Sequence, residues 1–136
     1  MKDVETLIPH RAPFLYVDRV IRASSEEIEG VKNFSDADEF LSGSFPEFAF
    51  VPGMVLVEAM AQCGGAGIKK LGLGSGMFAF AGIEKVLFHK GVPLNTDFVM
   101  VISNIKITDK YFKQSGKGYA GDQLCVEGVW ICVKIQ

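Results

Sequence analysis

The chain has 136 residues, the size of one domain, and 49% of them are hydrophobic. The chain has fourteen basic and sixteen acidic residues, so the charge balance gives no reason to expect nucleic-acid binding. No apolar run is long enough for a transmembrane helix or a signal peptide, which argues against a membrane protein and predicts a cytoplasmic one. We therefore expect a single domain over residues 1–136, with enough apolar surface left for an oligomer interface.

The first half of the chain predicts two strands and a short helix. Residues 14–23 (FLYVDRVIRA) are rich in β-branched and aromatic side chains, and residues 27–34 (EIEGVKNF) alternate, so the two segments can pair as antiparallel strands. Residues 35–41 (SDADEFL) predict a short helix capped by Ser35. The glycines and prolines of residues 42–53 indicate a loop.

A long helix is expected over about residues 54–71. A Pro-Gly pair precedes it, and two lysines and Gly72 stand at its end, which are typical start and stop signals. The segment is apolar nearly all round, as in a buried helix. Gly64 and Gly65 cost about 1 kcal/mol each relative to Ala in a helix, and they would let another backbone approach closely.

The second half of the chain predicts strands. Turn residues separate four β-branched and aromatic runs at short spacing, which favours antiparallel meanders. The runs cover residues 77–89, 97–109, 110–120 and 124–135. One buried helix with five or six antiparallel strands indicates the α+β class, in which a curved sheet wraps around a central helix.

Two polar side chains interrupt the apolar helix. Glu58 and Gln62 are four residues apart and therefore share a face. Glu58 either pairs with a backbone donor or a dimer interface, or performs acid–base chemistry. Gly53 either starts the helix as part of a Pro-Gly turn or presents its amide, near the positive helix end, to a carbonyl oxygen.

Three stretches together identify a family resemblance. They are IPHRAPFLYVDRV near the start, GSFPEFAFVPGMVLVEAMAQ in the middle, and FAGIEKVLF later. In this order they resemble the hotdog-fold 3-hydroxyacyl-[acyl-carrier-protein] dehydratases of fatty acid synthesis. The resemblance covers almost the whole chain and implies a hotdog fold, with the curved sheet around one long helix.

The resemblance also implies an active site. Members of that family are dimers, and each site lies at the dimer interface and binds an acyl-phosphopantetheine thioester in a tunnel. A His of one subunit and a Glu or Asp from the helix of the other remove water, and the amide of the helix-starting Gly polarises the thioester carbonyl. Those roles fall on Glu58 and Gly53 here, with no cofactor and no metal.

The family's catalytic His falls on Ser44, because this chain has G-S-F-P where the family has G-H-F-P. A serine hydroxyl cannot replace an imidazole as a base near neutral pH. A nucleophilic serine needs a neighbouring base, and the Ser-His pairing is absent here, which leaves Glu58 of a partner chain as the candidate base. Of the other histidines, His10 matches a family position that is not the catalytic one and is expected to fix the N-terminal turn. His89 is expected at the surface.

Several side chains are candidates for contact with substrate or carrier. Phe45 and Phe50, with Phe48 between them, either line an acyl tunnel or pack in the core. Gln62 is expected to contact the substrate beside Glu58. Scattered lysines either meet an acidic carrier protein or form a solvated face.

The sequence therefore predicts an acyl-thioester-binding protein of the dehydratase family, whose activity alone is impaired by the serine at position 44. Its partners would be an acyl carrier protein or a CoA thioester, and a second chain in a homodimer or in a heterodimer with a His-bearing paralogue. The alternatives are a Glu-donating subunit of a heterodimeric dehydratase, a hotdog thioesterase, and a non-catalytic acyl-thioester binding module.

Overall fold

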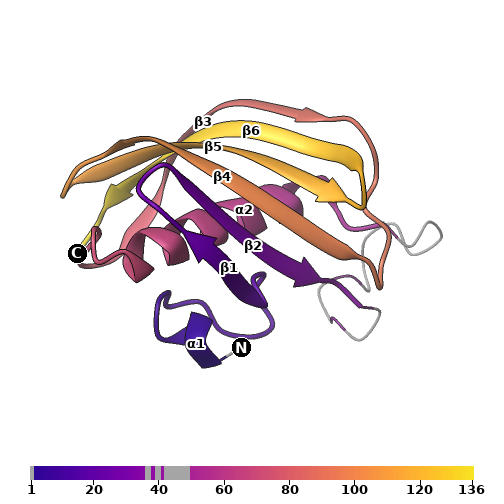
Figure 1. Cartoon of the computed structure of the whole chain (residues 1–136), viewed down its shortest axis with the longest axis horizontal. Helices are drawn as coiled ribbons and strands as arrows, with labels where there is room; N and C mark the ends of the chain where they lie inside the picture. Colours follow the sequence, from indigo (N-terminus) through magenta and orange to yellow (C-terminus); the bar gives the residue numbers. More distant parts are fainter. Residues whose placement is uncertain (1, 36–37, 39–40, 42–49) are drawn as a thin grey trace.

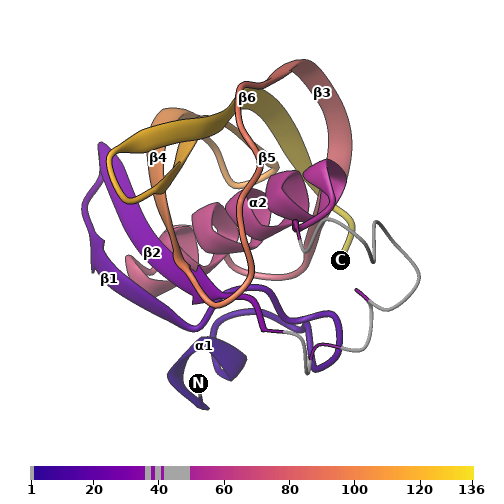
Figure 2. The same cartoon turned by 90° about the vertical axis from the view of Figure 1, so that its right-hand side faces the viewer.

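The computed structural model describes residues 2–35, 38, 41 and 50–136. Eight elements follow in chain order: α1 (Lys2–Glu5), β1 (Arg19–Ala23), β2 (Glu27–Asn33), α2 (Gly53–Lys70), β3 (Phe78–Phe88), β4 (Asp97–Ile107), β5 (Tyr111–Ala120) and β6 (Gln123–Lys134). The strands form one antiparallel sheet in the order β1-β2-β4-β5-β6-β3. Figure 1 shows this sheet arching over α2, and Figure 2, turned by 90°, shows the sheet curving around the helix. The predicted α+β architecture, a curved sheet around one long helix, is confirmed.

The core lies between the concave face of the sheet and α2. Alternate side chains in the first half of β4 point into it, and Phe98, Met100 and Ile102 are fully buried. Trp130 from β6 is also fully buried, and a Cβ at Gly116 on β5 would collide with its ring. The glycine therefore makes room for the largest side chain in the core.

Helix α2 is buried along most of its length, as its apolar sequence predicts. It begins at Gly53 rather than after it, and the carbonyl of Pro52 accepts hydrogen bonds from the amides of Val55 and Leu56. It ends at Lys70, because Gly72 adopts a φ of 73° and its amide returns to the carbonyl of Lys69. The helix thus begins and ends close to the predicted limits.

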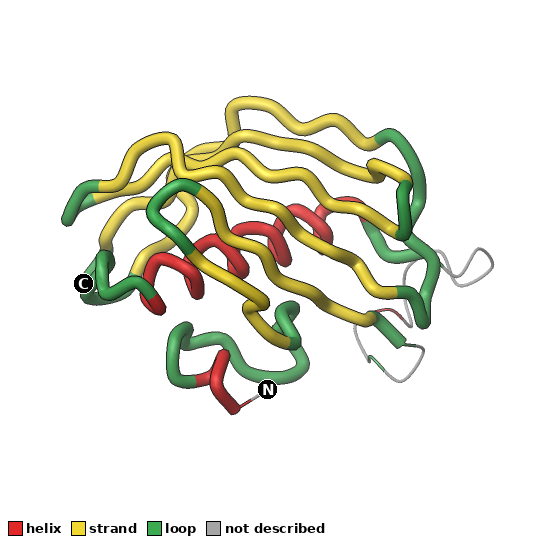
Figure 3. The backbone as a smooth tube through the Cα atoms, in the orientation of Figure 1, coloured by secondary structure: helices red, strands yellow, loops and turns green. Residues whose placement is uncertain are grey.

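The prediction of a strand over residues 14–23 is wrong in its first half, because β1 begins only at Arg19. The side chains of Leu15, Tyr16 and Val17 are buried, which explains the apolar pattern. The amide of Tyr16, however, donates to the Gln62 side chain on α2 instead of to a neighbouring strand. The segment therefore packs against the helix as irregular chain, as the tube in Figure 3 shows.

The remaining strand predictions are confirmed within one or two residues. The short helix predicted over residues 35–41 lies mostly outside the described residues. Within the described part of the chain, no helix is long and apolar enough to cross a membrane. The three cysteines, Cys63, Cys125 and Cys132, are buried free thiols.

Candidate active site

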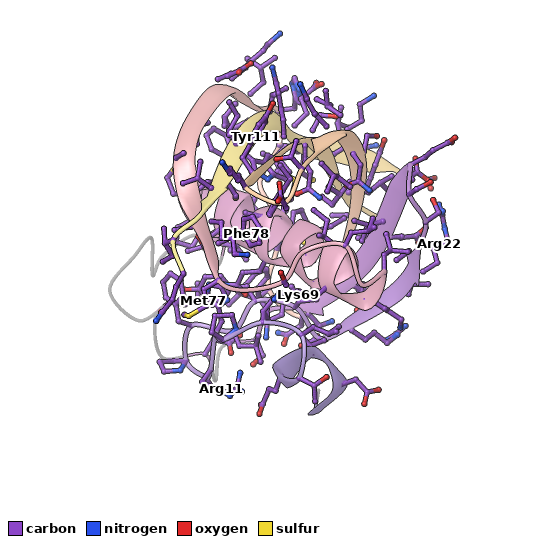
Figure 4. The ribbon with its side chains drawn as sticks, turned by 90° about the vertical axis from the view of Figure 1, so that its left-hand side faces the viewer. Arg11, Arg22, Lys69, Met77, Phe78 and Tyr111 are labelled. Atoms are coloured by element: carbon purple, nitrogen blue, oxygen red, sulfur yellow. The ribbon has the colours of Figure 1, made fainter. Side chains whose placement is uncertain are left out.

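A cavity of about 270 Å³ lies between α2, the N-terminal segment and the start of β3. Its walls are mostly apolar, and they include Ile8, Phe14, Ile68 and Phe112. Lys69, Met77 and Phe78, which Figure 4 labels, also line it, at the end of α2 and the start of β3. A mostly apolar cavity with a few polar groups is typical of a small-molecule site.

Glu58 and Gln62 both line this cavity, as their spacing on one helix face predicts. Gln62 is only 2% exposed and bonds in three directions. Its Oε1 accepts from the amide of Tyr16 at 2.8 Å, and its Nε2 donates to the carbonyl of Phe14 at 3.0 Å and to Glu58 Oε2 at 2.9 Å. Both hydrogens of the Gln62 amide are thereby used, and one of them positions the Glu58 carboxylate. The contact of Gln62 with substrate stays a prediction.

His10 is the third polar group of the cavity, and sequence reasoning did not place it there. Its Nε2 lies 3.6 Å from Glu58 Oε2, with the two side chains 29% and 21% exposed. Its Nδ1 is buried without a hydrogen-bond partner among the described residues. The N-terminal turn that His10 was expected to fix is held by the guanidinium of Arg11, which donates to the carbonyls of Glu5, Ile8 and His10.

Burial dominates the electrostatics of the cavity. It lowers the pKa of His10, assisted by the charge of Arg11 and opposed by the carboxylate of Glu58. Burial also raises the pKa of the Cys132 thiol, on the cavity wall, to about 12. At neutral pH the imidazole is therefore neutral and the thiol protonated, which leaves His10 and Glu58 as the groups suited to proton transfer.

Gly53 does not open onto this cavity. It borders a separate depression of about 520 Å³, together with Met54 and the end of β3 at Phe88. Its amide makes no hydrogen bond within the described residues, and no side chain caps this end of the helix. The amide is thus available to an oxygen atom of a ligand, but in one chain it does not face the same cavity as Glu58.

Of the other predicted site residues, the structure describes Phe50 alone. Ser44 and Phe45, together with Phe48, lie outside the described residues. Phe50 is exposed, forms an isolated bridge with Pro93, and lines neither depression. Its contact with substrate stays a prediction.

His89 lies at the surface, as expected, and borders the depression around Gly53. The Nε2 of His89 lies 2.8 Å from Glu127 Oε2, and the side chain is 40% exposed. Across the described ranges, no three His, Cys, Asp or Glu side chains gather as metal ligands would.

Comparison with known proteins identifies the family. Residues 8–132 match the FabA-like domain. The chain is 36% identical to the 3-hydroxyacyl-[acyl-carrier-protein] dehydratase FabZ of Natranaerobius thermophilus, over 94% of this chain and 92% of that protein. It is 38% identical to the FabZ of Streptococcus agalactiae, over 78% and 76% of the two chains.

Among solved structures, the dehydratase heterocomplex ApeI:P from Xenorhabdus doucetiae shares the fold, with a TM-score of 0.83 and 18% identity over 98% of this chain and 91% of that one. This likeness, together with the six-stranded sheet around α2, confirms the hotdog fold. The chain therefore belongs to the FabA-like family, among relatives of the FabZ 3-hydroxyacyl-[acyl-carrier-protein] dehydratases.

Proposed function

We propose that the protein takes part in the dehydration of 3-hydroxyacyl thioesters, with Glu58 as a proton-transfer group. The observation that carries this proposal is the placement of the Glu58 carboxylate at a mostly apolar cavity, where the buried Gln62 amide holds one of its oxygens. A carboxylate fixed in this way costs no reorganisation during the reaction. The names of the relatives support a carrier-protein thioester as the substrate, and a CoA thioester presents the same reacting atoms.

The site is proposed to be shared between two chains. Within one chain, Glu58 and the amide of Gly53 open onto different depressions, so a site that uses both groups must combine two subunits. Strand β3 supports such a dimer, because it stands at one end of the sheet and exposes Phe80, Ile83 and Leu87. Pairing two β3 edges would cover these apolar side chains and satisfy the edge hydrogen-bonding groups.

A heterodimer is the second arrangement we consider. The observation that favours it is Ser44, which stands where the family has its catalytic His. A paralogue with His at that position would supply an imidazole to the Glu58 of this chain. The ApeI:P structure is a dehydratase built as a heterocomplex, so the fold is known in such an assembly.

The test is an assay of the purified protein with 3-hydroxyacyl-CoA and carrier-protein thioesters, alone and after co-expression with a G-H-F-P paralogue. Glu58→Gln should lower kcat by about 10²–10⁴-fold in whichever assembly is active, with the melting temperature kept. Ser44→His tests the heterodimer arrangement, since a gain of activity in the homodimer would mean that an imidazole from that loop can serve the site.

Two outcomes would contradict the proposal. Release of free thiol without formation of the unsaturated thioester would indicate a thioesterase. Binding of thioesters without turnover in any assembly, unaffected by Glu58→Gln, would indicate a binding module.

A further inference from the structure

The chain contains two histidines, and each lies near a glutamate in a different setting. His89 is an exposed side chain whose Nε2 approaches Glu127 at 2.8 Å, a hydrogen-bond distance that occupies this nitrogen. His10 lies in the cavity wall beside Glu58. His89 borders the depression around Gly53, where its Nε2 is occupied by Glu127, whereas His10 borders the cavity that contains Glu58.

The distance between His10 and Glu58 leaves the imidazole nitrogen available. At 3.6 Å, Nε2 and Oε2 are near neighbours but lie beyond ordinary hydrogen-bond length. Gln62 holds the same Glu58 oxygen at 2.9 Å, and the His10 ring stacks on the ring of Phe14 with centroids 6.2 Å apart. Gln62 thus holds Glu58 and Phe14 holds His10, and both side chains line the cavity.

The surroundings of His10 favour a neutral ring. Burial removes water from the ring, which disfavours the charged imidazolium and lowers the pKa of His10. The charged and titratable groups around it are Glu58 and Lys69 on α2, Cys132 on β6 and the adjacent Arg11. Among these only Glu58 raises the pKa of His10, and burial outweighs it.

We propose that His10 supplies the imidazole of the dehydration site, in the same chain as Glu58. The inference rests on the proposed dehydratase function. The neutral ring carries its hydrogen on Nδ1, and Nε2 takes the proton from C2 of the 3-hydroxyacyl thioester. The C2–H electron pair forms the C2–C3 double bond, and the C3–O bond breaks.

In the reactive form the pair carries one mobile proton, on Glu58 opposite the neutral His10. The leaving hydroxyl takes this proton and departs as water. The pair then holds as many protons as before, with the mobile one on His10 instead of Glu58. Its transfer from Nε2 to Oε2, which face each other, restores the starting state. A second chain would contribute the Gly53 amide toward the thioester carbonyl, and Ser44 would not act as a base.

The experiment measures dehydration of a series of 3-hydroxyacyl-CoA thioesters by the full chain alone. The variants are His10→Gln, Glu58→Gln and, as an exposed control that lines neither depression, Lys106→Gln. A glutamine at position 10 keeps a polar group near Glu58 but cannot accept the C2 proton. We expect His10→Gln to lower kcat by about 10²–10⁴-fold and Lys106→Gln to leave it unchanged. The His10/Glu58 double variant should lose no more than the larger single loss.

The pH profile separates proton transfer from a structural role. The wild-type rate should fall on the acid side with an inflection below the ordinary imidazole pKa of 6.5, because protonated His10 cannot act as a base. The residual rate of His10→Gln should lack this acid limb. If His10→Gln fails to fold, the wild-type profile alone tests the proposal. An acid limb with its inflection at or above pH 6.5 would contradict it.

The outcomes distinguish this inference from the proposed function. If wild type is active and Glu58→Gln is not, but His10→Gln retains activity, the His10 role is overturned and the dehydratase function stands. If the chain is active only with a His-bearing paralogue, His10 is again overturned, while loss of the mixed activity on Glu58→Gln keeps the function. If Glu58→Gln has no effect in any assembly, both fail.

Discussion

Replacing Gln62 with leucine should detach the N-terminal segment from α2. The Gln62 side chain is the polar link between them, since it accepts from the amide of Tyr16 and donates to the carbonyl of Phe14. Leucine has nearly the same volume and adds no charge. It leaves both main-chain groups, and the oxygen of Glu58, without their partner.

The size of the effect follows from how buried each orphaned group is. The bond to Tyr16 N is buried, so its loss carries the full penalty of about 1–3 kcal/mol. The hydrogen bonds to Phe14 O and to Glu58 are only partly buried, so water can replace part of the lost hydrogen bonding. We therefore expect Gln62→Leu to lower the free energy of unfolding by about 2–4 kcal/mol.

Gln114 offers a matched control. It is also fully buried, but one of its bonds, to the carbonyl of Gly64, is long at 3.3 Å, and its Oε1 has no partner among the described residues. Gln114→Leu removes that unsatisfied oxygen together with the bond of 2.8 Å to Asn104, so it should cost about 1 kcal/mol or less.

The assay is urea unfolding of both variants at equal protein concentration, because a dimer's apparent stability depends on concentration. The difference is read from the midpoint at an unchanged m-value. If Gln62→Leu costs no more than Gln114→Leu, the three bonds of Gln62 do not hold the segment on the helix, and the reasoning is wrong.

Three further predictions concern the helix, the sheet edge and a thiol. Gly64→Ala should lower the unfolding free energy by about 1–3 kcal/mol, because its Cβ would collide with the Gln114 carboxamide. Gly65→Ala should raise it by up to about 1 kcal/mol, because its Cβ meets no other atom and alanine favours the helix. Urea unfolding of the two variants compares these effects. Ile83→Lys on the exposed β3 edge should shift a dimer toward monomer in sedimentation, and an unchanged mass would contradict the edge pairing. Cys132, with its pKa raised to about 12, should resist alkylation of the native protein at pH 8 and react after unfolding; rapid native labelling would refute its burial.

The sequence predicts the architecture well because its signals are local. The Pro-Gly pair, the two lysines and Gly72 mark the ends of α2 within a residue or two. Strand runs separated by turn residues likewise give all six strands. The failure at residues 14–18 has a physical cause, since the amide of Tyr16 bonds to a side chain of the helix, and a β-branched pattern cannot distinguish that partner from a strand.

The site is less predictable, because its key contacts are not local. His10 and Glu58 meet across 48 positions of sequence, and no spacing rule connects them. The separation of Gly53 from Glu58 had no such signal either. The group of interest at Gly53 is its backbone amide, and the first amides of a helix point along its axis whatever the residue spacing. A site that combines the two groups from two chains stays a prediction.

The retained carboxylate is the strongest argument that the site is more than a structural remnant. A carboxylate on a buried helix normally needs a cation or several backbone donors. Across the described residues, Glu58 has neither, since its neighbours are an amide that is itself anchored elsewhere and an imidazole that burial keeps neutral. The serine at position 44 therefore removes an imidazole from the loop without removing every imidazole from the carboxylate, because His10 already stands beside it.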